Sequence, residues 1–325
     1  MAYRPDDDHA AFERPRRRSR PRTKERPDYS SAPEARVVAV DRGRYRVVKV
    51  TDDATVSATK ARVLGRKGVI VGDVVKLDGD TSGDPGTLAR IVEVAPRRTM
   101  LRRSADDADT FERPIVANAD QLLIVTALAD PEPRMGMIDR ILVAAYDAGI
   151  APILCLTKAD LASPDELRAA YCPLGVPVVV TMPGADLDPV RAELRDQVSV
   201  FVGHSGVGKS TLVNALVPGV ERATGEVSGL TGKGRHTSTS AQAFELPGGG
   251  WIIDTPGVRS FGISHVRPDS ILAAFPDLAE VAEHCPRGCR HDWAAPECAL
   301  DQAVADHDLD PARLTSLRRM ERAFG

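Results

Sequence analysis

The sequence predicts an α/β fold in which strands and helices alternate around a glycine-rich loop, with a small β-barrel before it and a short helical region after it. Three observations lead to this prediction. A glycine-rich octapeptide at 203–210 lies between an apolar run and a helical pattern, short alternating segments fill residues 35–94, and cysteines gather beside a histidine at 285–298. We therefore expect four consecutive parts, spanning residues 1–32, 33–97, 98–264 and 265–325.

Composition and charge limit the class of protein. The chain has 325 residues, of which 42% are hydrophobic, enough for two or three packed domains. The formal net charge of −3 argues against a general polyanion binder. No apolar run approaches the roughly 18 residues of a membrane span, and the charged start lacks the apolar core of a secretion signal. We expect a cytoplasmic protein with no membrane partner.

Residues 1–32 are predicted to be a disordered basic tail. They are rich in Pro, Arg and Asp and have almost no apolar side chains to offset the entropy of folding. From Arg14 to Arg26 there are eight Lys or Arg residues and one acid, Glu25. Such an arm either binds RNA phosphates or only solubilises the chain, and the sequence favours neither.

Residues 33–97 are predicted to form a small β-barrel. Five or six short segments separated by Asp and Gly turns have strand character, namely 37–40, 45–50, 55–58, 69–71, 74–77 and 88–92. An OB-fold is one form of such a barrel, and it often binds oligonucleotides. Seven cations give it a basic side: Arg42, Arg44, Arg46, Lys60, Arg62, Arg66 and Lys67. Because Tyr45 is its only aromatic residue, backbone recognition is favoured over base stacking, and an inert charged face is the alternative.

Residues 98–264 are predicted to form an α/β domain around a phosphate-binding loop. The apolar run 198–202 leads into Gly203, His204, Ser205, Gly206, Val207, Gly208, Lys209 and Ser210, and Thr211 continues into a helical pattern. Strand, glycine loop and helix form the context in which backbone N–H groups bind phosphates. There Lys209 would reach the β and γ phosphates and Ser210 would ligate Mg²⁺. The sequence predicts a nucleoside triphosphate site; an ordinary glycine-rich turn is the alternative.

A motif before this loop indicates the base. The strand pattern 151–156 ends in Thr157, Lys158, Ala159 and Asp160, which resembles the N-K-x-D guanine motif. A carboxylate at 160 accepts from the paired N1–H and N2 donors of guanine, which adenine lacks. Thr157 replaces the usual Asn, and loss of the amide is expected to loosen the base pocket. Further strands are predicted at 121–126 and 176–181, with a helix at 137–148.

Two segments after the phosphate loop are predicted to be switches. The strand pattern 251–253 leads into a D-x-x-G motif, in which Asp254 would hold Mg²⁺ through water and the Gly257 N–H would contact the γ-phosphate. A hydroxyl from the earlier cluster Thr237, Ser238 and Thr239 would also bind Mg²⁺. The pattern does not decide which of the three does so.

Residues 265–325 are predicted to form a helical region around one metal ion. Cys285, Cys289, His291 and Cys298 have the spacing C-x3-C-x-H-x6-C. Three thiolates and an imidazole suit a closed, structural Zn²⁺ site, because no position remains for water. An odd total of five cysteines fits a metal in a reducing compartment better than disulfides. The tail 311–324 is predicted to be a basic helix that contacts rRNA or faces solvent.

The order of the motifs resembles one family. Guanine motif, phosphate loop, first switch and second switch follow one another, whereas ordinary GTPases have the guanine motif last. The chain is similar to circularly permuted GTPases, most closely the bacterial ribosome small-subunit-dependent GTPase A (RsgA) family, over roughly residues 35–320. The resemblance implies an N-terminal OB-fold, a permuted GTPase domain and a C-terminal zinc domain. It also implies that the protein binds GTP and GDP, contacts the 30S subunit and its 16S rRNA, and acts in late maturation of that subunit. We expect a monomer.

The resemblance also implies a catalytic histidine. Val258 follows the D-x-x-G glycine where many GTPases have a Gln that orients the attacking water. An aliphatic side chain cannot orient water, and the resemblance points to His236 in the first switch as the catalytic residue that does so. Lys209 would stabilise the charge of the transition state. The alternative is that His236 contacts RNA or merely packs. We expect GTP hydrolysis to GDP and phosphate, stimulated by 30S and coupled to release. An RNA-binding adaptor without turnover and an ATP-dependent kinase or helicase are the rival classes, and Asp160 argues against the latter.

Overall fold

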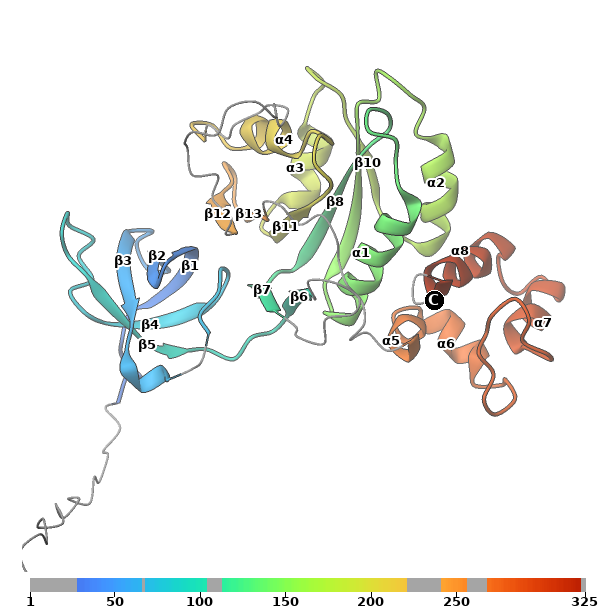
Figure 1. Ribbon diagram of the computed structural model, residues 1–325, viewed down its shortest axis with the longest axis horizontal. Coiled ribbons are helices and arrows are strands. Elements are labelled where there is room, and N and C mark those ends of the chain that lie inside the picture. Colours follow the sequence, from blue (N-terminus) through green and yellow to red (C-terminus); the bar gives the residue numbers. More distant parts are fainter. Residues whose placement is uncertain (1–27, 66–67, 104–112, 221–240, 256–267, 323–325) are drawn as a thin grey trace, which may run out of the picture. The chain divides into compact units, whose positions relative to one another are not determined.

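The computed structural model describes residues 28–65, 68–103, 113–220, 241–255 and 268–322. Its first part is a closed five-stranded barrel, blue to cyan in Figure 1. The strands are β1 (Glu34–Asp41), β2 (Arg44–Lys49), β3 (Thr55–Lys60), β4 (Val74–Gly79) and β5 (Ala89–Val94). They pair in the order β1-β2-β3-β5-β4, and β4 returns to β1. The closed order, with β3 and β5 parallel, confirms the expected OB-like barrel.

Side chains alternate along the barrel strands between core and surface. Val47 and Val56 are fully buried, while Arg44 and Arg46 face outward. Tyr45 is only 8% exposed. None of the described barrel residues therefore offers an exposed aromatic ring, and backbone recognition by the barrel stays a prediction.

The predicted strand at 69–71 is not a barrel strand. Val71 makes a single bridge with Val116, and the Asp73 carboxylate accepts the Ile70 N–H in a turn. This turn joins the barrel to the following domain. At Gly72, φ is +90° and a Cβ would lie 2.0 Å from the carbonyl oxygen of Ala117, so only glycine fits.

The second part is a six-stranded sheet with helices on both faces (Figure 1). Its strands are β8 (Gln121–Ala127), β9 (Ala151–Thr157), β10 (Val178–Val180), β11 (Val198–Val202), β12 (Gln242–Glu245) and β13 (Trp251–Asp254), in the order β10-β9-β8-β11-β13-β12. All are parallel except the edge strand β12. A separate hairpin, β6 (Met100–Arg103) and β7 (Arg113–Ala117), precedes the sheet.

The β8 side chains show how the two faces are covered. Leu122 and Ile124 pack with helices α1 (Met135–Asp147) and α2 (Asp165–Tyr171), whereas Leu123 and Val125 pack with α3 (Asp188–Leu194) and α4 (Lys209–Leu216). A strand buried on both faces has an apolar residue at nearly every position, as the sequence pattern predicted. Because parallel strands end at one edge, the carboxyl ends of β8, β9, β11 and β13 gather there.

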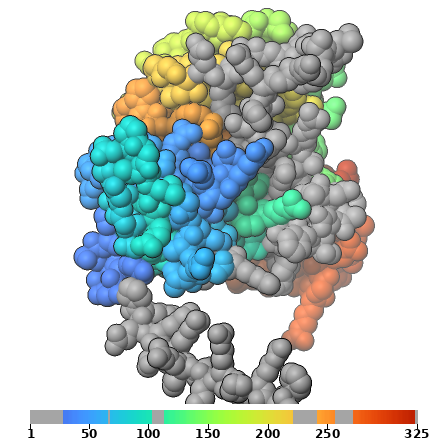
Figure 2. Space-filling model, turned by 60° about the vertical axis from the view of Figure 1, so that its left-hand side comes forward, coloured from blue at the N-terminus to red at the C-terminus, as the bar shows by residue number. Residues whose placement is uncertain are grey.

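The barrel and the sheet share one continuous hydrogen-bonded ladder. Strand β12 pairs with β1 at Ala39 and Gln242; in Figure 2 the barrel is blue to cyan and the β12–β13 hairpin is orange. The Arg97 guanidinium forms an ion pair of 2.7 Å with the fully buried Asp73. The β1–β12 pairing joins the barrel to the α/β domain, and the Arg97–Asp73 pair fastens the end of the barrel segment to the turn at 70–73.

The last part consists of short helices. These are α5 (Pro268–Ala273), α6 (Pro276–Ala282), α7 (Ala299–Ala305) and α8 (Pro311–Glu321). Leu278, Leu300 and Leu317 are fully buried and belong to the same apolar cluster as α1 and α2. No helix within the described residues is long and apolar enough to cross a membrane.

Candidate nucleotide site and metal centre

The predicted phosphate loop connects β11 to α4 and needs its glycines for two different reasons. Gly206 and Gly208 have φ values of +83° and +91°, which L side chains rarely adopt. At Gly203 a Cβ would lie 2.4 Å from the carbonyl oxygen of Val125. The N-cap residue of α4 is Gly208, which has no side chain to use the first N–H groups of the helix. A strand, a tight loop and an uncapped helix start form a cradle suited to phosphate oxygens.

Lys209 and Asp254 meet at this edge of the sheet. Lys209 begins α4, Asp254 ends β13, and their side chains form an ion pair that is 11% and 1% exposed. The neighbouring Thr255 hydroxyl donates to the carbonyl oxygen of Phe201 at 2.8 Å, which fixes the end of β13 against β11. The phosphate loop and the D-x-x-G motif are thus brought together, as their sequence patterns require.

Thr157 connects the guanine motif to the phosphate loop. Its hydroxyl donates a 2.6 Å hydrogen bond to the carbonyl oxygen of Val207, and the residue is only 6% exposed. A Cβ on Gly208 would lie 3.7 Å from the same hydroxyl. The sequence predicted that Thr157, in place of the usual Asn, loses a side-chain amide. The Thr157 hydroxyl instead makes a direct contact with the phosphate loop.

The rest of the guanine motif lies in a turn after β9. Lys158 has φ of +58°, and its Nζ donates to the carbonyl oxygen of Asp130. The Ala159 N–H donates to the carbonyl oxygen of Thr181 at 3.2 Å, which joins this turn to the end of β10. Asp160 is exposed, so its carboxylate is accessible to a ligand. Backbone carbonyls such as those of Asp130 and Val207 have no signature in a sequence, and for that reason they were not predicted.

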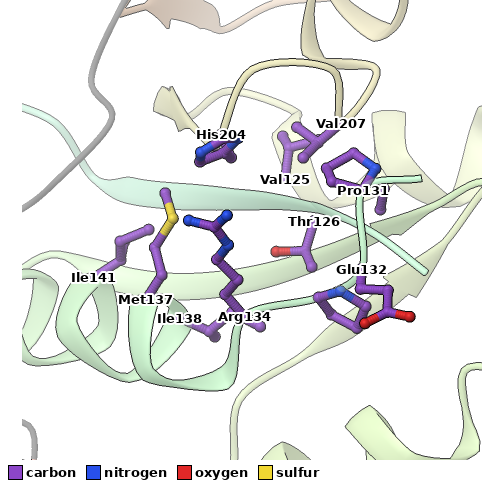
Figure 3. Close-up of a pocket in the computed structure, with 13 residues that line it drawn as sticks. Val125, Thr126, Pro131, Glu132, Arg134, Met137, Ile138, Ile141, His204 and Val207 are labelled. Atoms are coloured by element: carbon purple, nitrogen blue, oxygen red, sulfur yellow. The ribbon is translucent and has the colours of Figure 1, made fainter. Parts of the chain in front are cut away.

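A small pocket adjoins the phosphate loop on the α1 side. His204 from the loop and Arg134 and Met137 from the start of α1 point toward one another there (Figure 3). His204 Nδ1 also lies 3.1 Å from the carbonyl oxygen of Ser205. The side chain of His204 therefore faces α1, and its predicted nucleotide contact would have to be made by its backbone.

Several predicted residues lie outside the described residues. These are His236, Thr237, Ser238 and Thr239 of the first switch, together with Gly257 and Val258 of the second. The basic tail 1–27 lies outside them as well.

The four predicted metal ligands come together between α6 and α7. His291 Nδ1 lies 3.6 Å from Cys285 Sγ, 3.6 Å from Cys289 Sγ and 3.8 Å from Cys298 Sγ. A tetrahedral Zn²⁺ with bonds of about 2.3 Å to sulfur and about 2.0 Å to nitrogen separates its ligands by roughly 3.5–3.8 Å. The donor set and its spacing therefore fit such an ion.

A backbone N–H group and the side chain of Arg318 hold these ligands in place. The Ala299 N–H donates to Cys285 Sγ at 3.2 Å. Arg318 donates to the carbonyl oxygen of His291 at 2.8 Å and forms a two-pronged pair with Asp301 at 2.8 and 2.7 Å. The pKa of Asp301 is lowered, chiefly by the hydrogen bond from Arg318. The cluster is thus tied to α8 as well as to its own loop.

The arginines of α8 mostly bind other parts of the protein. Arg319 pairs at 3.1 Å with the buried Asp139 of α1, and its guanidinium lies 4.6 Å from the ring centroid of Tyr171 in α2. Arg313 pairs with Asp277 at 2.6 Å, and its Nη1 donates to the carbonyl oxygen of Pro173 at 2.7 Å. These contacts fasten α8 to the α/β domain and to α6, and rRNA contact by this helix stays a prediction.

The sheet order, the phosphate loop and the preceding guanine motif define a circularly permuted GTPase. The RsgA GTPase family model matches residues 94–264. The chain is 46% identical, over 71% of its own length and 69% of the relative's, to the small ribosomal subunit biogenesis GTPase RsgA of Pseudomonas aeruginosa (strain LESB58). The protein of that name from Ectopseudomonas mendocina is 42% identical over 78% and 74% of the two chains.

Solved structures agree with this assignment. The crystal structure of YjeQ from Thermotoga maritima matches with a TM-score of 0.68 and 25% identity, over 90% of this chain and 98% of that one. The circularly permuted GTPase YloQ matches in fold with a TM-score of 0.67 and 24% identity, over 91% and 96%. The chain belongs to the RsgA GTPase family, and it is a GTPase.

Proposed function

We propose that this GTPase binds the 30S ribosomal subunit, assists its late maturation and leaves it after hydrolysing GTP. The observation that carries the use of GTP in this proposal is that the guanine motif, the phosphate loop and the D-x-x-G motif meet at one sheet edge. The Thr157–Val207 hydrogen bond and the Lys209–Asp254 ion pair connect them. The relatives named as small ribosomal subunit biogenesis GTPases support the choice of partner. The contact with 16S rRNA, the monomeric state and the cytoplasmic location stay predictions.

The chain's own groups suggest how GTP is held. The N–H groups of Gly203–Thr211 would bind the phosphates, and Lys209 would exchange its Asp254 partner for β and γ oxygens. Ser210 and Asp254 are placed at the same edge and would hold Mg²⁺, with Thr237 or Thr239 as a further ligand. That ion would supply neutralisation of the phosphate charge. The exposed Asp160 would select guanine, with the Lys158 stem along the base.

Catalysis is proposed to depend on His236. Val258 cannot orient a water molecule, and His236 would do so once the small subunit has ordered the first switch. The Cys285, Cys289, His291 and Cys298 cluster would hold one structural Zn²⁺.

Binding to purified 30S subunits tests the proposed partner. We expect the protein to co-sediment with 30S when loaded with a non-hydrolysable GTP analogue, and to be released when loaded with GDP. The Lys209→Ala variant, with a damaged phosphate site, should lose this nucleotide dependence. Equal co-sedimentation with the analogue, with GDP and without nucleotide would contradict the proposed coupling to release.

A further inference from the structure

Trp293 is an exposed aromatic side chain on the loop of the candidate metal centre. It lies between the ligands His291 and Cys298, and 53% of its surface is exposed. Large aromatic residues usually bury most of their surface, and an exposed indole often marks a contact with a partner. Trp251, the other tryptophan of the chain, is half-buried in β13.

The indole is held on a firm support. The guanidinium of Arg318 lies 5.1 Å from its ring centroid and that of Arg322 lies 5.6 Å away. Arg318 is itself fixed by Asp301 and by the carbonyl oxygen of His291, and its side chain is 4% exposed. Trp293 is therefore oriented before any partner binds, which lowers the entropic cost of binding.

Further exposed cations lie on the same loop and at the end of α8. The Arg290 side chain is 85% exposed and lies 3.5 Å from the Asp292 carboxylate, and Arg287 and Arg322 are also exposed. The nearby Asp301 is engaged by Arg318, so its charge is matched. An exposed ring on a loop that also carries exposed guanidinium groups suits a planar base attached to an anionic backbone.

We propose that Trp293 is a stacking platform for an unpaired RNA base, with Arg290 and Arg322 contacting the flanking phosphates. The inference rests on the proposed function, for which it names an RNA contact in the last part of the chain. The barrel offers basic groups without an exposed ring, so the two surfaces would recognise RNA in different ways. Stacking on Trp293 requires single-stranded RNA, because bases in a duplex are already stacked.

Fluorescence provides the first test. The Trp251→Phe variant of the full chain leaves Trp293 as the single tryptophan. Titration with a single-stranded oligouridylate should quench its emission to saturation, and added salt should weaken the binding. A duplex RNA of equal length should quench much less. Absent quenching, or equal quenching by single-stranded and duplex RNA, would overturn the proposal.

Substitution of Trp293 provides the second test. Trp293→Ala should weaken binding to 30S roughly tenfold, whereas Trp293→Phe should retain most of it, since loss of one stacked base typically has an effect of this size. Both substitutions are made in the Trp251→Phe background, and both variants should keep the metal content and melting temperature of Trp251→Phe, which is the control. If Trp293→Ala bound 30S as tightly as the control, stacking would be refuted while the proposed function stood. Failure of the wild-type chain to bind 30S would instead refute the proposed function. A third outcome is that Trp293→Ala binds 30S more weakly while oligouridylate does not quench the Trp293 emission of Trp251→Phe. That outcome would indicate a ribosomal protein as the partner of Trp293 and would overturn the RNA proposal.

Discussion

The hydroxyl of Thr157 and the carbonyl oxygen of Val207 are 2.6 Å apart, and this hydrogen bond joins the base-recognition segment to the phosphate loop. The two residues come from β9 and from the loop after β11, which are not neighbouring strands in the sheet. Binding of the base and binding of the phosphates are therefore structurally connected. The connection depends on a hydroxyl where the common motif has an amide.

Removal of this hydroxyl is expected to weaken nucleotide binding. Thr157→Val keeps the shape of the side chain but leaves the Val207 carbonyl without its donor, which typically costs about 1–3 kcal/mol for a buried group. The dissociation constants of fluorescent GTP and GDP derivatives should rise by roughly tenfold, whereas Thr157→Ser should bind nearly as the wild type does. Wild-type affinity in Thr157→Val would show that the hydrogen bond does not support the site.

Guanine selectivity is expected to depend on Asp160. Asp160→Asn exchanges two acceptors for an acceptor and a donor, which matches the 2-oxo group of xanthine, so preference should move from GDP toward XDP. Competition with a fluorescent guanine nucleotide measures the change. Glu166→Gln, an equivalent substitution at an exposed position in α2, should leave the preference for GDP intact. Equal binding of ADP and GDP by the wild-type chain would contradict the assignment.

The metal centre is expected to hold about one zinc per chain. Elemental analysis of protein purified without chelators measures it. Cys289→Ala removes one of the four ligands and should lose the zinc and lower the melting temperature, whereas Cys172→Ala removes an exposed thiol outside the cluster and should do neither. Zinc-free wild-type protein, or unchanged zinc in Cys289→Ala, would be inconsistent with this centre.

The contact between Arg319 and Asp139 is expected to stabilise the docking of α8. Burial raises the pKa of Asp139, and the charge of Arg319 opposes this effect. Arg319→Met leaves the buried carboxylate without its cation, with the 3.0 Å hydrogen bond from the Tyr171 hydroxyl retained, and should lower the free energy of unfolding by about 3 kcal/mol at pH 7. The pKa of Asp139 in the folded protein is raised above its unfolded value of about 3.9. The contribution of Asp139 to the free energy of unfolding is therefore most favourable at low pH, and it is lost as the pH rises through the pKa of the folded state.

The pH dependence separates this effect from a loss of packing. The difference in stability between Arg319→Met and wild type should be larger at pH 8 than at pH 5, as measured by denaturant unfolding. With Asp139→Asn added, the pH-dependent part should disappear because no carboxylate remains. An identical difference at both pH values would show that Asp139 is not the responsible group.

The sequence was sufficient wherever local patterns determine structure. Gly206 and Gly208 have positive φ angles that a phosphate loop requires, and the Cys/His spacing was close enough to predict the four-ligand cluster. Long-range partners could not be predicted in the same way. A basic helix with Arg313, Arg318 and Arg319 has the composition of an RNA-binding or solvent-exposed helix, and only the fold shows that Asp277, Asp301 and Asp139 are their partners.

The most direct test of the account is the rate of GTP hydrolysis with and without purified 30S subunits. We expect slow hydrolysis by the free wild-type protein and at least about tenfold stimulation by 30S, because ordering of the first switch would place His236 against the attacking water. His236→Ala should still bind GTP and 30S but lose most of the stimulation, whereas Lys209→Ala should bind GTP weakly. A wild-type rate unaffected by 30S would contradict subunit-dependent hydrolysis, and full stimulation of His236→Ala would remove the histidine from the mechanism.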